Sequence, residues 1–420
     1  MIKTFHNFMD YYKKIKCRLC QSTKLISVLK LTPTAIGNHF VTEPLIDRHQ
    51  KNYPLELNFC DDCKHVQLVY VVDPEILYQQ KYSYVSSTSL VFVDHLERYS
   101  QEILSRYQIK KNSLILDIGS NDGTSLSFFK RRGYRTLGID PATEIVAEAN
   151  KNGIETLCEF FSSNVAKRYV SKYGKAQLIN SHNTCAHIDD LPDVIEGVKY
   201  WLNDDGLFVM EVGYLFDVIE HTWFDTIYHE HLDYHSLFPL VSFFKSKNMQ
   251  IISVKRISPQ GGSIRIIAQK NNGPYSIDTS VAEILNLEKL SGMNQYTIFQ
   301  NFEKKIHKVK LELVTLIKEI KQKNKTIAGY GAPTKATTLL THFGLGDKLD
   351  FLIDDNKLKQ GLYSPGHHIP VYGTDVLYKR QPDYLVILAW NFAEDIMKKH
   401  QKYKSSGGNF IVPMPEVKIF

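Results

Sequence analysis

The chain has 420 residues, of which 43% are hydrophobic and 23% are charged, and its formal net charge is +6. This composition is typical of a water-soluble globular protein with room for two or three domains. Lysines gather in 302–325 and 398–404, where a solvated helix face accounts for them, so no nucleic-acid partner is implied. No stretch approaches the roughly 18 apolar residues of a membrane span, and the N-terminus lacks the apolar core of a secretion signal. We therefore expect a cytoplasmic protein without a membrane partner.

Four of the six cysteines form two Cys-x-x-Cys pairs, Cys17 with Cys20 and Cys60 with Cys63. Paired knuckles of this kind supply the thiolates of a tetrahedral zinc site, and a reducing cytoplasm disfavours disulfides. Because four thiolates close the coordination shell, the predicted zinc ion stabilises the fold and takes no part in catalysis. Two unrelated redox pairs are the alternative.

The knuckles are predicted to belong to a small domain over residues 1–75, with inserted loops or strands between them. The two other cysteines, Cys158 and Cys185, stand alone in apolar surroundings and are predicted to be core residues. Two helical stretches should follow between 74 and 111, around a tyrosine-rich loop at 81–89.

The next stretch, from Ser113 to Asp140, predicts a β-loop-α-β unit. An apolar strand at 114–116 leads into Asp117 and a glycine loop, and a second strand at 136–139 ends at Asp140. In open α/β sheets ligands bind at the carboxyl ends of the strands, and an acid at the second strand end holds ribose hydroxyls. An adenosine-containing cofactor is therefore predicted; a glycine turn that any parallel sheet needs is the alternative.

The glycine loop favours one cofactor. Dinucleotide folds use three glycines because a pyrophosphate must lie on the helix N-terminus, whereas the loop from Gly119 to Gly123 lacks the middle glycine and carries Asp122. An acid repels phosphates but not a sulfonium or ammonium group. The loop resembles the first motif of class I S-adenosylmethionine-dependent methyltransferases, and NAD is the lesser alternative. The predicted cofactor-binding residues are Asp117, Gly119, Asn121, Gly123 and Asp140.

Two segments that follow strands are rich in reactive side chains, NSHNTCAHIDD at 180–190 and FDTIYHEHLDYHS at 224–236. His229 and His231 are two residues apart, a spacing that suits a strand edge and not the helical spacing of a zinc protease. A general acid/base cluster is preferred, because neutral histidine is a competent base near pH 7. A catalytic metal and purely structural histidines are the alternatives.

Beyond the first sheet, which extends to about residue 270, apolar residues at three-to-four spacing predict a long helix over 294–323. A second strand-glycine-helix unit begins at 326, with Pro333 opening the helix. The helix N-terminus beside Lys335 is a predicted anion site; a tight turn with a solvated lysine is the alternative. The predicted domains are 1–75 (zinc-binding), 76–293 (methyltransferase with a helical lead-in), 294–324 (linking helix) and 325–420 (C-terminal α/β).

The whole layout resembles a family of sugar C-methyltransferases that act on nucleotide-linked 4-keto-6-deoxyhexoses. The resemblance rests on the two knuckles and on the segments LDIGSNDGT, IYHEHLDYHSL, GGSIRI, GYGAPTKATTLL and IDDNKLKQGLYSPG. It implies a Rossmann-like α/β methyltransferase sheet, a small zinc-binding domain before it and a Rossmann-like α/β domain after it.

The resemblance also implies roles for individual residues. His231 matches the base that removes the proton beside the keto group, and Tyr228 and Glu230 match neighbours that position the sugar and handle protons. Tyr82 and His187 match further active-site positions.

Four cysteines, Cys17, Cys20, Cys60 and Cys63, coincide with the family's zinc ligands. Arg265 and Lys335 are expected from position alone to contact the nucleotide of the substrate.

The sequence therefore predicts a chain, monomeric or homodimeric, that methylates C3 of a nucleotide-linked 4-keto-6-deoxyhexose through an enolate. Two alternatives stay open at this point. One is an NAD-dependent sugar-nucleotide oxidoreductase or epimerase, and the other is a zinc-knuckle binding module on a degenerate enzyme fold.

Overall fold

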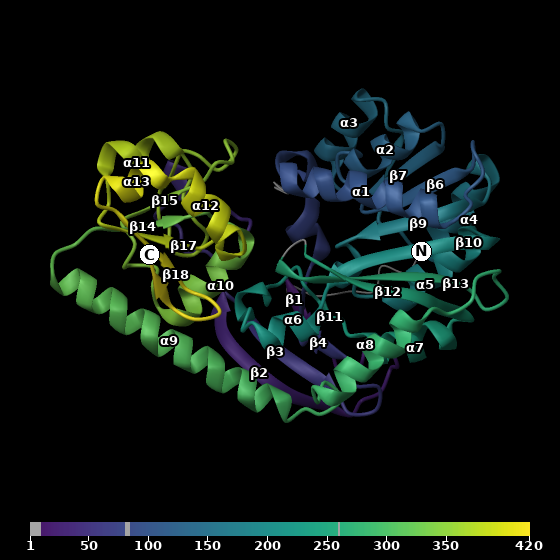
Figure 1. Ribbon diagram of the computed structural model, residues 1–420, viewed down its shortest axis with the longest axis horizontal. Coiled ribbons are helices and arrows are strands. Elements are labelled where there is room, and N and C mark those ends of the chain that lie inside the picture. Colours follow the sequence, from purple (N-terminus) through teal and green to yellow (C-terminus); the bar gives the residue numbers. More distant parts are fainter. Residues whose placement is uncertain (1–9, 80–84, 259–260) are drawn as a thin grey trace.

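The computed structural model describes residues 10–79, 85–258 and 261–420. Two α/β lobes stand side by side, joined along one edge by the N-terminal strands and by a long helix (Figure 1). Within the described residues, no helix is long and apolar enough to cross a membrane.

The larger lobe is built on a seven-stranded sheet in the order β12-β13-β10-β9-β6-β7-β8. Its strands are β6 (Leu114–Ile118), β7 (Arg135–Asp140), β8 (Thr156–Cys158), β9 (Ala176–His182), β10 (Leu202–Gly213), β12 (Met249–Ile257) and β13 (Ser263–Lys270). The run from β8 to β10 is parallel, and β13 lies antiparallel between β10 and β12. This is the sheet of class I methyltransferases, and the predicted α/β fold class is confirmed.

Helices cover both faces of this sheet (Figure 1). Their bounds are α1 (Leu90–Arg106), α2 (Thr124–Arg131), α3 (Thr143–Lys151), α4 (Ser163–Tyr173), α5 (Leu191–Trp201), α6 (Leu215–Glu220), α7 (Leu237–Ser246) and α8 (Thr279–Leu290). Ile115 packs with α1 and α2, whereas Leu114 and Leu116 belong to the core with α4 and α5. Because side chains alternate along a strand, Asp117 points to the same side as Ile115.

The N-terminal strands form two antiparallel sheets. A small one pairs β1 (Tyr11–Lys13) with β5 (Tyr70–Val72). The other has the order β11-β4-β3-β2, with β2 (Leu25–Thr34), β3 (Tyr53–Cys60), β4 (Val66–Leu68) and β11 (Asp233–Tyr234). Its edge strand β11 therefore comes from the middle of the larger lobe and lies within the histidine-rich segment at 224–236.

The second lobe is a six-stranded sheet in the order β16-β15-β14-β17-β18-β19, parallel except for β19. Its strands are β14 (Ile327–Tyr330), β15 (Phe351–Ile353), β16 (Val371–Tyr372), β17 (Tyr384–Ile387), β18 (Asn409–Val412) and β19 (Lys418–Ile419). Its helices are α10 (Thr334–Phe343), α11 (Thr374–Arg380), α12 (Ala393–Lys399) and α13 (Gln401–Ser405). Both α10 and the linking helix α9 (Ile298–Gln322) contact β2.

Two details differ from the sequence predictions. Helix α9 begins at Ile298, after a turn that the apolar pattern does not reveal. Cys185 is buried as expected, but the prediction for Cys158 is wrong. Cys158 ends the edge strand β8, where no further strand covers it, and its side chain is exposed.

The buried face of α9 provides a test of the linkage between the lobes. Leu313 is fully buried and Leu311 is 61% exposed on the same helix. We expect Leu313→Ala to lower the free energy of unfolding by about 2–5 kcal/mol because it leaves a cavity. Leu311→Ala, the matched control, should change it by no more than about 0.5 kcal/mol. Thermal unfolding midpoints of both variants check this, and equal losses would contradict it.

Candidate active site

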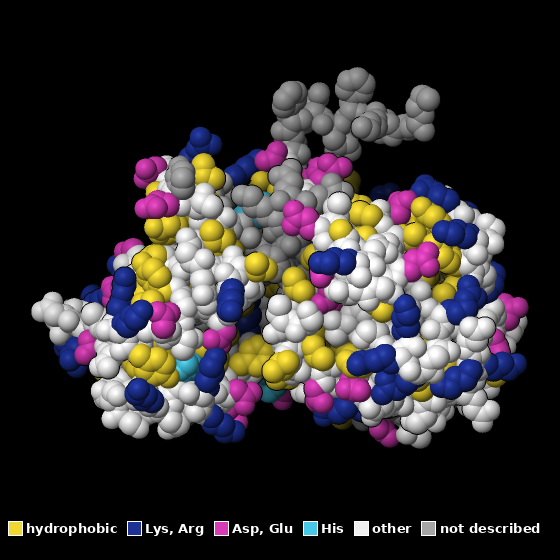
Figure 2. Space-filling view, turned by 90° about the horizontal axis from the view of Figure 1, so that it is seen from above, with side chains coloured by type: hydrophobic (Ala, Val, Ile, Leu, Met, Phe, Trp, Pro, Cys, Tyr) yellow, Lys and Arg dark blue, Asp and Glu magenta, His cyan; other side chains and the backbone are white. Residues whose placement is uncertain are grey.

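One cavity of about 530 Å³ lies where the three parts of the chain meet. Its wall includes Asn38 from the N-terminal part, Asp117 and His231 from the larger lobe, and Lys335 and Lys359 from the second lobe. Figure 2 looks onto the furrow between the lobes, where hydrophobic side chains gather. The cavity adjoins the carboxyl ends of β6, β7 and β9, the place at which open α/β sheets bind ligands.

Two residues of the loop after β6 have backbone angles and close neighbours that only glycine tolerates. Gly119 has a φ of +72°, and a Cβ there would lie 2.0 Å from the Thr184 hydroxyl. Gly123 has a φ of +78° and forms the N-cap of α2, where a Cβ would meet Ile154 at 2.7 Å. Glycine is therefore needed at both positions for the loop to pack against Thr184 and Ile154; Gly119 lines the cavity and Gly123 does not.

Asp117, near the end of β6, has a carboxylate oxygen, Oδ1, without a hydrogen-bond partner among the described residues. It is 2% exposed and lines the cavity. Burial raises its pKa to about 6. A buried carboxylate oxygen without a partner is costly, so the residue fits a cationic ligand such as the ammonium of an amino acid.

The other acids of this motif are used differently. Asp140 accepts hydrogen bonds from the backbone N–H groups of Asn121 and Ala142, at 2.9 Å each, and still lines the cavity. Asp122 is not part of the cavity wall. Its carboxylate accepts hydrogen bonds from the N–H of Ser87 at 3.0 Å and from the Thr124 hydroxyl at 2.6 Å. The sequence argument that Asp122 repels phosphates therefore loses its geometric basis.

Four further polar residues line the cavity: Tyr228, Glu230, His231 and His187. The Tyr228 hydroxyl lies 2.7 Å from His231 Nε2, and His231 Nδ1 lies 2.8 Å from the carbonyl oxygen of Thr226. Since a carbonyl only accepts, we assign the imidazole proton to Nδ1, which leaves the lone pair on Nε2. Burial lowers the pKa of His231 to about 4, so the ring is neutral at pH 7.

His187 lies beside this imidazole, and Glu230 lines the same cavity. Glu230 is 4% exposed, and its Oε1 accepts a hydrogen bond from the Asn38 amide at 2.7 Å. Burial raises the pKa of Glu230 to about 7. The His187 ring lies 5.1 Å from the His231 ring and is stacked at 6.1 Å on Tyr78, and burial lowers its pKa well below the ordinary range.

The segment that carries these residues is not a strand edge, contrary to expectation. Residues 227–232 form turns between a short 3-10 helix (Phe224–Thr226) and β11. Consequently the two histidines diverge. His231 faces the cavity, whereas His229 lies 3.2 Å from the Tyr53 carbonyl in the N-terminal sheet and is absent from the cavity wall. The two rings do not converge on a shared metal position.

Lys335 lies at the second lobe's side of the cavity, in the first turn of α10. Its Nζ donates to Asn391 at 2.7 Å and lies 3.4 Å from the centre of the Trp390 ring. Burial, partly offset by Asp225, lowers its pKa to about 8. The Trp390 indole donates to Asp225 at 2.7 Å.

Sequence reasoning missed Lys359, Asn391 and Asn38, which also line the cavity. The Lys359 ammonium donates to the Ala332 carbonyl at 2.8 Å, beside the glycine loop of the second lobe. Isolated lysine and asparagine residues carry no local signal, so only their positions in the fold identify them.

Two of the expected site residues need separate mention. Tyr82 lies outside the described residues. Arg265 is not part of the cavity wall, because its guanidinium is paired with Glu211 and Glu102 below the sheet. Its place on β13, opposite Glu211 in the register, directs it there.

Each of the three parts of the chain matches a known protein family. Three family models match: "Putative zinc binding domain" over residues 17–78, "Methyltransferase domain" over 92–254 and "C-methyltransferase C-terminal domain" over 258–415. The C-methyltransferase NovU of Streptomyces niveus is 32% identical over 405 residues, which are 96% of each chain. The chain belongs to this C-methyltransferase family. It is an S-adenosylmethionine-dependent methyltransferase with a structural zinc site.

Solved methyltransferase structures that resemble this chain cover less than half of it. An S-adenosylmethionine-dependent methyltransferase from Clostridium acetobutylicum is 13% identical and covers 43% of this chain and 91% of its own, with a TM-score of 0.33. The plantazolicin methyltransferase BpumL, solved with S-adenosylhomocysteine, is 16% identical and covers 43% of this chain and 84% of its own, with a TM-score of 0.34. Likeness of this degree assigns no function.

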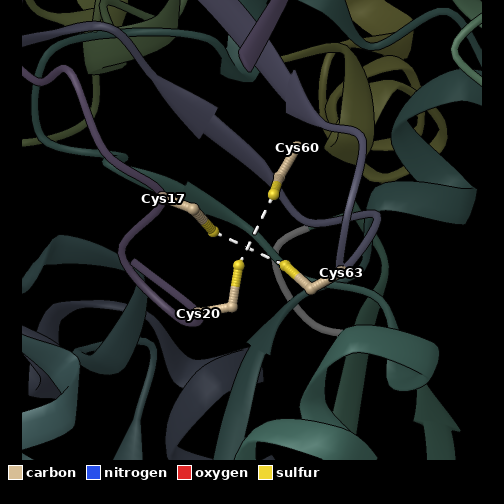
Figure 3. A group of neighbouring side chains, drawn as sticks. All are labelled: Cys17, Cys20, Cys60 and Cys63. Atoms are coloured by element: carbon tan, nitrogen blue, oxygen red, sulfur yellow. Dashed lines mark hydrogen bonds between the residues drawn. The ribbon is translucent and has the colours of Figure 1, made fainter. Parts of the chain in front are cut away.

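The zinc site of this C-methyltransferase consists of Cys17, Cys20, Cys60 and Cys63, whose sulfur atoms point toward one another (Figure 3). The sulfurs of Cys17 and Cys63 are 3.5 Å apart and those of Cys20 and Cys60 are 3.6 Å apart. Tetrahedral zinc with its ordinary bond length to sulfur requires a separation of about 3.8 Å. The four residues therefore fit the ion with little movement.

Removing one ligand tests this assignment. We expect Cys63→Ser to lower the zinc content and the thermal unfolding midpoint, because an open coordination shell holds the ion less tightly. Cys158→Ser, at an exposed cysteine outside the cluster, is the matched control and should retain the ion. Elemental analysis of the purified variants measures the zinc, and full occupancy in Cys63→Ser would contradict the assignment.

Proposed function

We propose that this enzyme methylates C3 of a nucleotide-linked 4-keto-6-deoxyhexose through an enolate. The observation that carries the proposal is the neutral imidazole of His231, which lines the cavity and keeps its proton on Nδ1 against the Thr226 carbonyl, so that the Nε2 lone pair lies beside the Tyr228 hydroxyl. A base of this kind removes a proton from carbon only if a neighbouring keto group can take up the charge. A 4-keto sugar offers that group beside C3.

The reaction begins with transfer of the C3 proton to His231 Nε2, while the C–H electron pair forms a C3=C4 double bond and the π pair of the C4 keto group moves onto its oxygen, which gives the enolate. The Tyr228 hydroxyl, 2.7 Å from Nε2, orients the imidazole, and its oxygen can accept a hydrogen bond from the N–H that forms there. When bound, S-adenosylmethionine supplies an electrophilic methyl group on a sulfonium. The Thr226 carbonyl stabilises the imidazolium that the proton transfer creates.

Charge on the enolate oxygen requires donors. Glu230 is the candidate, since Asn38 occupies Oε1 and a proton can reside on Oε2 when the carboxyl group is neutral. Burial favours this neutral form. A preorganised donor of this type is worth about 2.7–4 kcal/mol of barrier.

The two ends of the cavity suit the two reactants. Asp117, with its unpartnered oxygen, and Asp140, at the end of β7, are the residues proposed to hold the ammonium and the ribose of the methyl donor. Lys335 and Lys359 supply positive charge on the second lobe and are proposed to face the phosphates of the sugar nucleotide. Holding both reactants in one cavity can lower the barrier by about 7–11 kcal/mol.

The family assignment leaves no support for an oxidoreductase or for a bare binding module. We expect a cytoplasmic enzyme that acts as a monomer or a homodimer. The substrate class is tested by incubating the enzyme and S-adenosylmethionine with a panel of nucleotide-linked 4-keto-6-deoxyhexoses and measuring product mass. A mass gain of one methyl group on none of them would contradict the proposal.

Removal of the base tests the chemistry. We expect His231→Asn to lower kcat by about 10²- to 10⁴-fold, the usual contribution of a general base, and to leave the Kd for S-adenosylhomocysteine unchanged. In deuterium oxide without methyl donor, the unaltered enzyme should exchange the C3 proton and the variant should not. His229→Asn is the matched control, since His229 faces the N-terminal sheet. Undiminished proton exchange in His231→Asn would overturn the assignment.

The raised pKa of Glu230 predicts a pH dependence. Below about pH 7 the carboxyl group is protonated and donates to the keto oxygen, and above it the group is ionised and cannot. We therefore expect kcat/KM to fall as the pH rises through about 7. Glu230→Gln keeps a donor at every pH and should remove this limb. A rise of kcat/KM through pH 7 would show instead that the carboxylate is the active form.

A further inference from the structure

Arg18 lies inside the first knuckle, between two of the zinc ligands, and is the most deeply buried arginine of the N-terminal part that the structure describes. Its side chain is 0% exposed. The backbone N–H of Arg18 donates to the Gln67 side chain at 2.8 Å, which fixes the backbone position from which the Arg18 side chain extends. An arginine with no solvent contact must find its partners within the protein.

The guanidinium of Arg18 reaches out of the zinc-binding part and into the larger lobe. Its Nε donates to Asp189 Oδ1 at 2.9 Å, and its Nη1 donates to the carbonyl oxygens of Leu68 at 2.8 Å and Leu232 at 3.3 Å. Asp189 lies two residues after His187, and Leu232 directly follows His231. One side chain therefore contacts both segments that carry the imidazoles of the cavity.

These two segments also contact each other at the same point. The N–H of Leu232 donates to the Ala186 carbonyl at 2.7 Å, and the N–H of Leu68 donates to the Leu232 carbonyl at 2.8 Å. The Leu232 carbonyl thus accepts from β4 and from Arg18 together. Lys14 binds the same carboxylate of Asp189 at 2.7 Å, and the Tyr12 hydroxyl donates to it as well.

We infer that Arg18 is a positioning residue, which is anchored in the zinc knuckle and sets the distance between the His187 and His231 segments. The inference rests on the proposed function, in which His231 is the base. Proton abstraction from carbon is sensitive to position, and a displacement of about 1 Å can cost 10²-fold in rate. Lysine cannot replace arginine here, because a single ammonium group lacks the fork that spans a carboxylate and a carbonyl.

The test uses Arg18→Met, which keeps the apolar stem and removes the charge, together with Asp189→Asn from the other side of the pair. We expect each variant to bind zinc and S-adenosylhomocysteine like the unaltered enzyme, while kcat falls by about 10²-fold and KM stays the same. Backbone hydrogen exchange, followed by mass spectrometry, should become faster over 185–189 and 228–234 and stay unchanged over 114–118.

Asp62→Asn is the matched control. Asp62 lies in the second knuckle and pairs with the exposed Lys24 at 3.0 Å, away from both segments. The Asp62→Asn variant should have the same kcat as the unaltered enzyme and the same backbone hydrogen exchange over 185–189 and 228–234.

An unchanged kcat in both Arg18→Met and Asp189→Asn overturns the inference, and so does a fall in kcat without faster exchange at the two segments. If the unaltered enzyme methylates none of the sugars, the proposed function fails on its own. In that case hydrogen exchange alone tests whether Arg18 holds the His187 and His231 segments in place. Faster exchange confined to these two segments in the variants supports this role, and unchanged exchange overturns it.

Discussion

Strand β11 is two residues long and could not persist alone; it forms because β4 of the zinc-binding part pairs with it. The turn that presents His231 to the cavity ends at this strand. Beyond β4, the sheet continues through β3, which ends at Cys60 of the second knuckle. The His231 segment is thus held from outside its own lobe, and the zinc cluster fixes the sheet that holds it.

Burial acts on the groups of the cavity in one direction, toward their neutral forms. It lowers the pKa of His231 to about 4 and of Lys335 to about 8, and it raises the pKa of Glu230 to about 7. A neutral imidazole beside a neutral carboxyl group is the combination that enolate formation needs, with one group accepting a proton and the other donating a hydrogen bond. The same low-dielectric surroundings that stabilise the fold therefore set the protonation states that the proposed chemistry requires.

On the α1 side of the sheet, the alternation of side chains brings together four ionisable groups, of which Asp117 and His182 line the cavity. Asp117, His182, Glu211 and Arg265 come from neighbouring strands and point to the α1 side. Burial opposes a charge on His182, yet Glu211, 3.1 Å away, raises the pKa of the ring, and Arg265 completes the pairing. Because Arg265 is paired within this network, it does not line the cavity.

The sequence by itself determined whatever is decided within a few residues: the β-loop-α-β unit and its obligatory glycines, the four cysteines as one set, and the apolar face of α9. It also located the histidine-rich segment, because reactive side chains cluster there after a strand. Only the tertiary structure decided which way each side chain of that segment points, which nitrogen of His231 carries the proton, and that Arg265 turns away from the cavity while Lys359 faces it. The physical reason is that these properties depend on partners far along the chain. Asn38 and Glu230 are 192 positions apart, and Arg18 and Leu232 are 214 apart, so no local pattern can encode them.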